Sequence, residues 1–147
     1  MSFKATNIVL SRAYDEIKRE AVAVKRASEG VRLAAVADIP ASMILSLAGS
    51  LRSHRLNMQE RASVPGIAAH ARTQENDAAY DVAVEYVALR NGIDSALLWI
   101  STNMPSNQGY LQAQTLEADG SLTQRMFTPA QTAGLVTELV ALEALIS

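Results

Sequence analysis

The hydrophobic residues of this chain recur at the spacing of an α-helix along most of its length. In the first part, apolar or small residues alternate in steps of four and three, which places them on one helix face. These positions are Leu10, Tyr14, Ile17, Ala21, Val24, Ser28, Val31 and Ala35. They predict a long helix over about residues 4–36. Because Ala21, Ser28 and Ala35 are small, either a second helix approaches closely there or a groove remains.

Two more long helices are predicted. Pro40 follows a break in the pattern and suits the first turn of a helix over about residues 40–61. Asn76 or Asp77 is an expected N-cap for a third helix that ends near Asn103, although Asn91 and Gly92 could kink or split it. Between the second and third long helices, residues 67–74 leave room for a short helix. The inward positions of the long helices are Ile44, Leu47, Ala48, Leu51, Arg55 and Met58, then Tyr86, Leu89, Ile93, Leu97, Ile100 and Met104.

The pattern changes near residue 110, where two short β-tolerant runs surround an Asp119-Gly120 turn signal. They predict a β-hairpin over about residues 110–127. A two-stranded hairpin alone is marginally stable in water. Its polar residues indicate that one face is exposed or meets another chain; they are Gln112, Gln114, Thr115, Thr123 and Gln124.

The last helix has a clear start signal. Thr128 is followed by Pro129 and, three positions on, by Gln131, which together form a capping box with proline at the first helical position. Leu135, Leu139, Leu142 and Ile146 supply its apolar face. Since no repeat or linker divides the chain, the prediction is a single domain over residues 1–147. It is mainly α: a helical bundle of three long helices plus a C-terminal helix, with the β-hairpin inserted before that last helix.

Charge is divided unevenly along the 147 residues. The formal net charge is −2, but residues 1–73 have a balance of +5 and residues 74–147 a balance of −7. Such halves either neutralise each other within one fold, which we favour, or steer one molecule onto the next. Lys18, Lys25 and Arg32 form a basic row at a spacing of seven. We interpret it as a solvated helix face, with contact to nucleic acid or an acidic partner as the alternative.

Residue types that carry chemistry are sparse. There is no cysteine, which excludes disulfides, thiolate metal sites and cysteine nucleophiles. Neither His54 nor His70 has an acidic residue at helical ligand spacing, and we interpret the pairs Glu16–Glu20 and Asp81–Glu85 as solvated. Phosphate-binding and Gly-x-Ser-x-Gly motifs are absent. We therefore expect no catalytic, cofactor or metal site and no enzymatic activity.

The apolar runs also bear on location. None approaches the roughly 20 residues that a membrane-spanning helix needs, and the first residues do not read as a secretory signal. We therefore expect a soluble protein with no membrane partner.

The region from Val64 to Ile146 resembles a known group of proteins. Its features are Val64-Pro65-Gly66-Ile67, the long acidic helix ending in Trp99 and Ile100, Pro105, Gly109-Tyr110-Leu111, and the run RMFTPAQTAGL over residues 125–135. This arrangement is similar to small structural proteins of tailed bacteriophages and prophages, of the head-to-tail adaptor (neck) type. The resemblance covers a little over half of the chain and none of residues 1–63.

The resemblance implies a structural virion protein, a connector subunit that forms a homo-oligomeric ring beneath the portal. Its implied partners are other copies and other virion proteins such as portal and tail components, with non-specific proximity to DNA left open. It would be assembled in the bacterial host cytoplasm and would need no cofactor. The candidate subunit-interface residues are Lys18, Lys25, Arg32, Gln112, Gln114, Gln124 and Arg125. The alternatives are a monomeric helical module that binds a peptide or ligand, or another capsid-associated phage protein.

Overall fold

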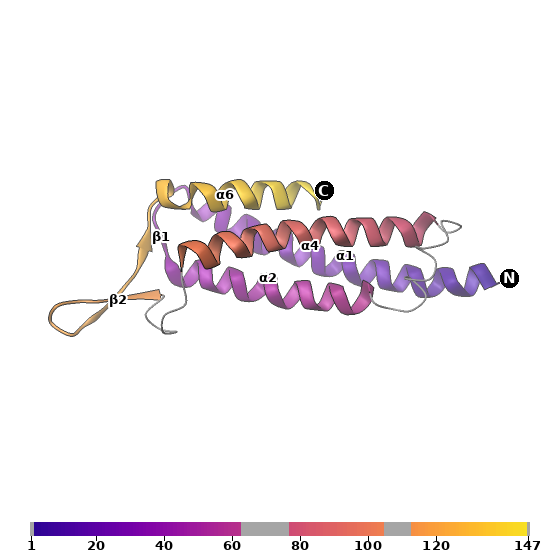
Figure 1. Ribbon diagram of the computed structural model, residues 1–147, viewed down its shortest axis with the longest axis horizontal. Coiled ribbons are helices and arrows are strands. Elements are labelled where there is room, and N and C mark those ends of the chain that lie inside the picture. Colours follow the sequence, from indigo (N-terminus) through magenta and orange to yellow (C-terminus); the bar gives the residue numbers. More distant parts are fainter. Residues whose placement is uncertain (1, 63–76, 105–112, 147) are drawn as a thin grey trace.

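In the computed structural model, the described residues form four helices that lie side by side along one long axis (Figure 1). The structure describes residues 2–62, 77–104 and 113–146, and the side chains of 15–61, 86–104 and 113–146 among them. The helices are α1 (Ser2–Ala34), α2 (Ala41–Ala62), α4 (Asp77–Asn103) and α6 (Pro129–Ala144). The predicted mainly α bundle with a hairpin is confirmed. The short helix expected over residues 67–74 lies outside the described residues.

Helix boundaries follow the local signals closely. Helix α1 ends two residues before the predicted end, and α4 spans the predicted range without a break at Asn91 and Gly92. At the start of α6, the Thr128 side chain accepts a hydrogen bond from the Gln131 amide at 3.3 Å, and the Gln131 side chain accepts one from the Thr128 amide at 2.8 Å. This capping box, predicted from the sequence, satisfies two amides that a helix start otherwise leaves unpaired.

The predicted hairpin is shorter than expected, and its last residues pair elsewhere. Strands β2 (Gln114–Leu116) and β3 (Leu122–Gln124) form the antiparallel hairpin. Strand β4 (Met126–Phe127) instead pairs with β1 (Ile39–Pro40), with Ile39 opposite Phe127. The prediction that residues 110–127 form one hairpin is therefore wrong in its last part. Pro40, expected to begin α2, lies in β1 because a two-stranded pair consists only of edges, where proline is tolerated.

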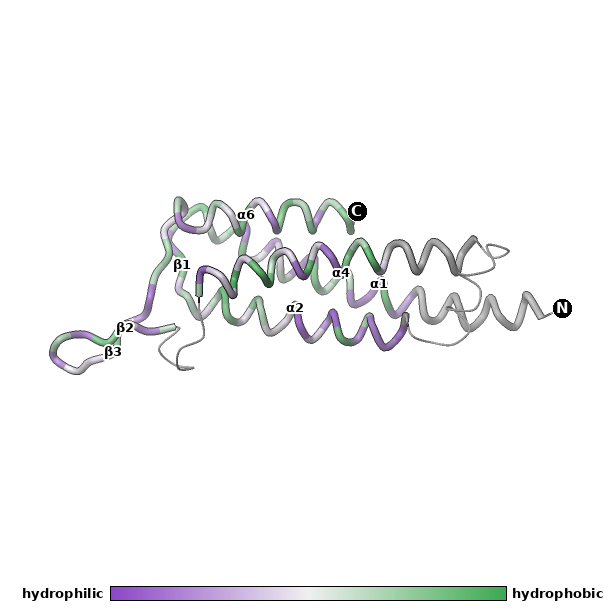
Figure 2. Tube along the Cα trace, in the orientation of Figure 1, coloured by the Kyte–Doolittle hydropathy of each residue, from purple (hydrophilic) through white to green (hydrophobic). Residues whose placement is uncertain are grey.

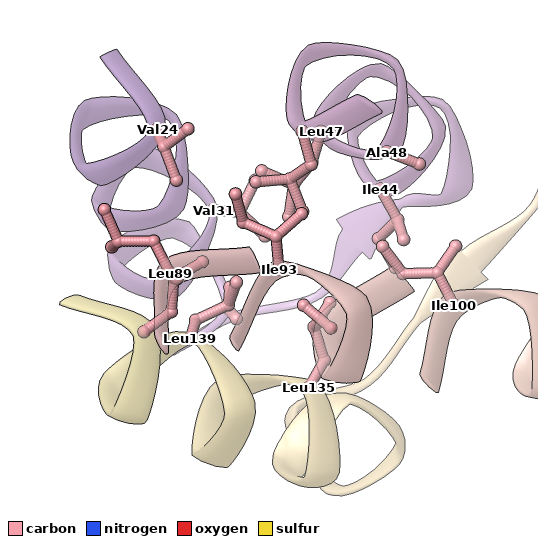
Figure 3. Close-up of a cluster of buried hydrophobic side chains, with 14 of the residues drawn as sticks. Val24, Val31, Ile44, Leu47, Ala48, Leu89, Ile93, Ile100, Leu135 and Leu139 are labelled. Atoms are coloured by element: carbon pink, nitrogen blue, oxygen red, sulfur yellow. The ribbon is translucent and has the colours of Figure 1, made fainter. Parts of the chain in front are cut away.

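The core lies between the four helices. Val24 and Val31 of α1, Ile44 and Leu47 of α2, Ile93 of α4 and Leu135 of α6 meet there (Figure 3). In each long helix the predicted inward positions with described side chains are buried, except Arg55 and Leu97, which are half-buried. Burial of such a face is what stabilises amphipathic helices. The predicted positions Leu10 and Tyr14 lie outside the described side chains. The second half of α2 is mainly hydrophilic (Figure 2) and contributes polar contacts in addition to the buried Met58.

Glycines let α6 lie close to α4. A Cβ on Gly134 would come within 2.5 Å of Trp99 Nε1, and one on Gly92 within 3.0 Å of Leu145 Cδ1. At Gly134 the distance is too short for any real contact, so a larger residue would displace the Trp99 ring or α6. At Gly92 the contact would be tight, and the ends of the Leu145 and Leu142 side chains would have to move by a few tenths of an ångström. Gly92 thus serves helix packing and does not interrupt α4.

No helix in the part of the chain that the structure describes combines the length and apolarity needed to cross a bilayer.

Candidate functional site

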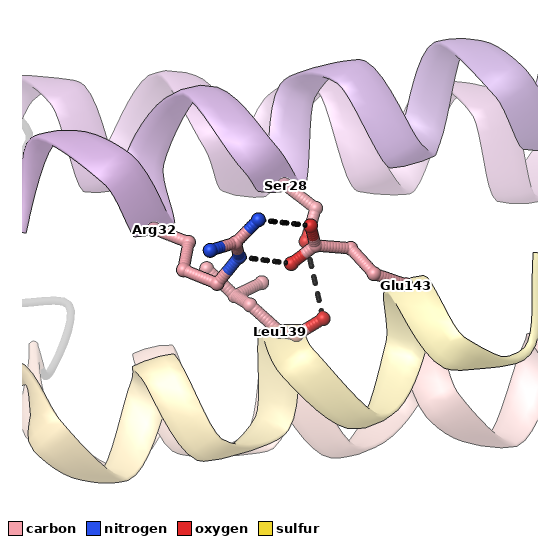
Figure 4. Close-up of polar contacts among 4 residues, drawn as sticks. All are labelled: Ser28, Arg32, Leu139 and Glu143. Carbon is pink, nitrogen blue, oxygen red and sulfur yellow. Dashed lines mark hydrogen bonds and ion pairs between the residues drawn. The ribbon is translucent and has the colours of Figure 1, made fainter.

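The seam between α1 and α6 contains one of the predicted interface residues. Arg32 donates two hydrogen bonds to Glu143, from Nε to Oε2 at 2.7 Å and from Nη2 to Oε1 at 2.9 Å (Figure 4). This bond to Glu143 raises the pKa of the Arg32 guanidinium above its ordinary value. The interpretation of Arg32 as part of a solvated row is therefore wrong, because its charge is committed to a contact between helices of the same chain.

Helix α6 also packs against Ser28, one of the small residues of α1. Ser28 is fully buried, and its hydroxyl donates to the Leu139 carbonyl oxygen at 3.5 Å (Figure 4). The position that a ligand-binding groove would need open is therefore occupied by α6. Of the two outcomes that the small residues allowed, close approach of a helix is observed at Ser28, whereas a cavity of about 290 Å³ lies beside Ala21.

Polar contacts join α2 to its neighbours. Arg61 pairs with Glu16 at 2.6 Å, and His54 pairs with Glu20. Asn57 donates to the second oxygen of Glu20 at 3.3 Å. Glu16 and Glu20, expected to be only solvated, thus hold α1 against the hydrophilic half of α2.

Among the described side chains, two ion pairs connect the basic half of the chain to the acidic half. One is Arg32 with Glu143, and the other is Arg55 with Asp94, with Nε and Oδ1 2.8 Å apart. Arg55 Nε is not aligned for a hydrogen bond, so that contact is electrostatic, whereas Nη2 donates to Oδ2 at 3.2 Å. These pairs support the interpretation that the charge division is partly neutralised within the fold.

Several exposed cations lie on the outside of α1. An open, shallow depression of about 470 Å³ on the surface of α1 is lined by residues of this helix alone, and we call it the α1 outer groove. Its residues are Asp15, Lys18, Arg19, Val22, Ala23 and Arg26. Lys18, Arg19 and Arg26 are exposed and outnumber the single acid. Val22, 43% exposed, places an apolar side chain among these cations. Lys25 is half-buried and does not line this groove.

One face of the hairpin carries both polar and apolar side chains. Gln114 lies opposite Gln124 and Leu116 opposite Leu122, so these four side chains share one face because strand residues alternate sides. The leucines are 63% and 43% exposed. Sequence reasoning identified the glutamines and missed the leucines, although the alternation of Gln114 and Leu116 carried the signal. The predicted interface residue Gln112 lies outside the described residues.

A tight turn closes the hairpin. The Gly120 amide donates to the Glu117 carbonyl oxygen at 3.0 Å, and the Glu117 amide donates to that of Ser121 at 2.8 Å. Gly120 has a φ of 88°, a conformation that favours glycine. Asp119 accepts hydrogen bonds from the Ser121 hydroxyl and amide, which lower the pKa of its carboxyl group. The turn is therefore ordered and acidic.

Arg125 joins the hairpin to the bundle through its backbone. Its amide donates to the Ala113 carbonyl oxygen at 2.8 Å, and its carbonyl accepts from the Ala41 amide, the first of α2, at 2.7 Å. Its guanidinium lies over the Phe127 ring, 4.9 Å from the ring centre. This predicted interface residue thus has a structural role at the junction of the two small sheets.

The described candidate residues fall into two separate groups, one on α1 and one on the hairpin. Among the side chains that the structure describes, no three histidine or acidic residues gather in a way that could hold a metal ion. The arrangement offers surfaces for contact: a basic and apolar groove on α1, and an acidic turn next to a leucine pair. Comparison with known proteins finds no matching protein family, no similar curated protein and no similar solved structure.

Proposed function

We propose that this protein is a structural assembly subunit, a connector of the head-to-tail adaptor type that forms a ring beneath the portal of a tailed phage. The observation that carries the proposal is the β2–β3 hairpin, which projects from one end of the helical bundle (Figure 1). All its residues from Thr115 to Gln124 are exposed.

The hairpin is expected to be only marginally stable unless another surface covers it. Two strands alone bury too little apolar area to be more than marginally stable. The exposed Leu116 and Leu122 add apolar surface that water solvates poorly. A partner that covers the hairpin would relieve both costs, which is the behaviour expected of an assembly arm.

The resemblance of residues 64–146 to phage adaptor proteins supports the choice of assembly. It covers both the hairpin turn and the RMFTPAQTAGL run that leads into α6. On this proposal the protein resides in the virion, is assembled in the bacterial host cytoplasm, and contacts portal and tail components as well as its own copies. Its role is architectural and needs no catalytic group.

The test is native mass spectrometry of the purified protein, with negative-stain microscopy of the protein and of phage particles. A closed ring of fixed copy number, and the protein's presence at the particle neck, are the expected results. A matched variant replaces residues 114–124 with a short Gly-Ser turn; it should keep its helical circular dichroism and lose assembly. A wild-type protein that stays monomeric at every concentration, and that is missing from purified particles, contradicts the proposal.

A further inference from the structure

The hairpin and the α1 outer groove have complementary surfaces. The hairpin turn carries Glu117 and Asp119, and no basic residue occurs between positions 113 and 124. The groove carries Lys18, Arg19 and Arg26. Each surface also places exposed aliphatic side chains beside its charges: Leu116 and Leu122 on the hairpin, and Val22 in the groove.

The acidic groups of the turn keep capacity for a partner. Glu117 accepts one hydrogen bond from the Thr123 hydroxyl at 2.6 Å, and Asp119 accepts two from Ser121 through a single oxygen. A carboxylate accepts about four hydrogen bonds in total. Both side chains can therefore hold the turn and still contact an arginine.

Two arginines of the groove, Arg19 and Arg26, also keep capacity for a partner. Within the described part of the chain, Arg19 and Arg26 form no ion pair, in contrast to Arg32, Arg55 and Arg61. Arg19 precedes Val22 by three positions and Arg26 follows it by four, so all three side chains lie on one side of α1. An acidic, leucine-bearing turn would meet both kinds of group in one contact.

The hairpin of the same chain does not reach this groove. At a rise of about 1.5 Å per residue, Lys18 and Arg26 lie about 24 and 12 Å back along the axis from the end of α1. The hairpin leaves the bundle beyond that end and points away from the N-terminus (Figure 1). A hairpin that binds in this groove must therefore belong to another molecule.

We infer that the β2–β3 hairpin of one copy docks in the α1 outer groove of a second copy. This inference deepens the proposed function and rests on its premise of self-assembly. The contact joins two different surfaces, so each copy keeps one hairpin and one groove free for further copies. Repetition of such a heterologous contact produces a closed ring when the rotation between neighbours closes.

Cross-linking tests the contact directly, because the natural chain has no cysteine. Leu122→Cys and Val22→Cys proteins are purified separately, mixed and oxidised. The mixture should form a disulfide-linked heterodimer, since docking brings the two α-carbons within the roughly 7 Å that a disulfide requires. Neither protein alone should cross-link. Leu98→Cys on α4, also exposed to solvent, is the control for Val22→Cys and should not link to Leu122→Cys.

Charge reversal supplies an independent measurement by sedimentation. Arg26→Glu and Glu117→Lys should each weaken self-association at least about fivefold, and the double variant should recover most of the loss. Arg52→Glu, at an exposed position on α2, is the control and should leave association unchanged.

The outcomes separate this inference from the proposed function. Rings without the disulfide between positions 22 and 122, or with additive charge-reversal effects, overturn the docking contact and leave ring assembly standing. Self-linked Leu122→Cys protein overturns it in favour of hairpin-to-hairpin pairing. A protein that remains monomeric overturns both.

Discussion

Arg32 on α1 and Glu143 on α6 form a two-bond ion pair across 111 positions of sequence, with distances of 2.7 and 2.9 Å. Paired hydrogen bonds between a guanidinium and a carboxylate have a fixed planar geometry that lysine cannot reproduce. The pair therefore fixes where the C-terminal helix rests on the first helix.

We predict that this ion pair couples the two helices energetically. Arg32→Lys and Glu143→Gln should each lower the urea midpoint of unfolding, and the double variant should lose less than the sum of the two. The coupling should decrease, without vanishing, as salt is added, because Glu143 is largely covered. Arg52→Lys, at an exposed position, serves as the control. If the loss in the double variant equals the sum of the two single losses, the ion pair contributes nothing beyond its separate side chains.

A second prediction concerns the contact between α4 and α6. Gly134→Ala should destabilise the fold by about 1 kcal/mol or more, because the new Cβ would lie 2.5 Å from Trp99 Nε1. The clash should outweigh the roughly 1 kcal/mol that alanine contributes through helix propensity. The fluorescence of Trp99, the one tryptophan of the chain, should change in the folded protein.

The control for this substitution is Gly30→Ala on α1, where nothing lies within 4 Å of the added carbon. There the helix propensity acts alone, and the free energy of unfolding should rise by about 0.5–1 kcal/mol. If both substitutions stabilise the protein, α6 can move away from Trp99 at little cost and the close approach is not required.

Local signals along the sequence predicted most of the fold. The capping box at Thr128 and Gln131 and the bounds of α4 needed only nearby residues, and both are observed. Strand β1 was missed because two residues, Ile39 and Pro40, are too few to show a period. Its partner, β4, lies far away in the sequence and was assigned to the hairpin.

The candidate site was harder to predict because its residues depend on where α6 ends. Lys18 and Arg32 lie on the same face of α1 by their spacing, yet Lys18 is exposed whereas Arg32 is half-buried beside Glu143. Helix α6 ends at Ala144 and covers only part of the length of α1. The residue spacing within α1 does not predict where α6 ends, so the different environments of the two cations could not be predicted from the sequence.

A third prediction concerns pH and the hairpin turn. The hydrogen bonds from Ser121 lower the pKa of Asp119 below its ordinary value of 3.8 in the folded protein. A lowered pKa means that the ionised carboxylate stabilises the turn, and this stabilisation is present above pH 3.8. It is lost as the pH falls through the lower, folded pKa.

Amide hydrogen exchange at Ser121 measures this loss. Protection of that amide should fall at acid pH in the wild type, whereas Asp119→Asn should give a protection that does not change over the same range. A wild-type amide that keeps its protection well below pH 3.8 would mean that the protonated side chain holds the turn equally well.

The last prediction concerns the backbone of Arg125, which is the link between the hairpin and the bundle. Arg125→Pro removes the amide that donates to Ala113, whereas the carbonyl that accepts from Ala41 remains. The amides of residues 114–124 should then exchange faster, while those of α6 and the helical circular dichroism stay unchanged. Arg125→Ala keeps the amide and loses only the contact of the guanidinium with Phe127, which is worth about 0.5–1 kcal/mol. Both variants lack the arginine side chain. If the amides of residues 114–124 exchange equally fast in both, the guanidinium anchors the hairpin and the backbone hydrogen bond does not.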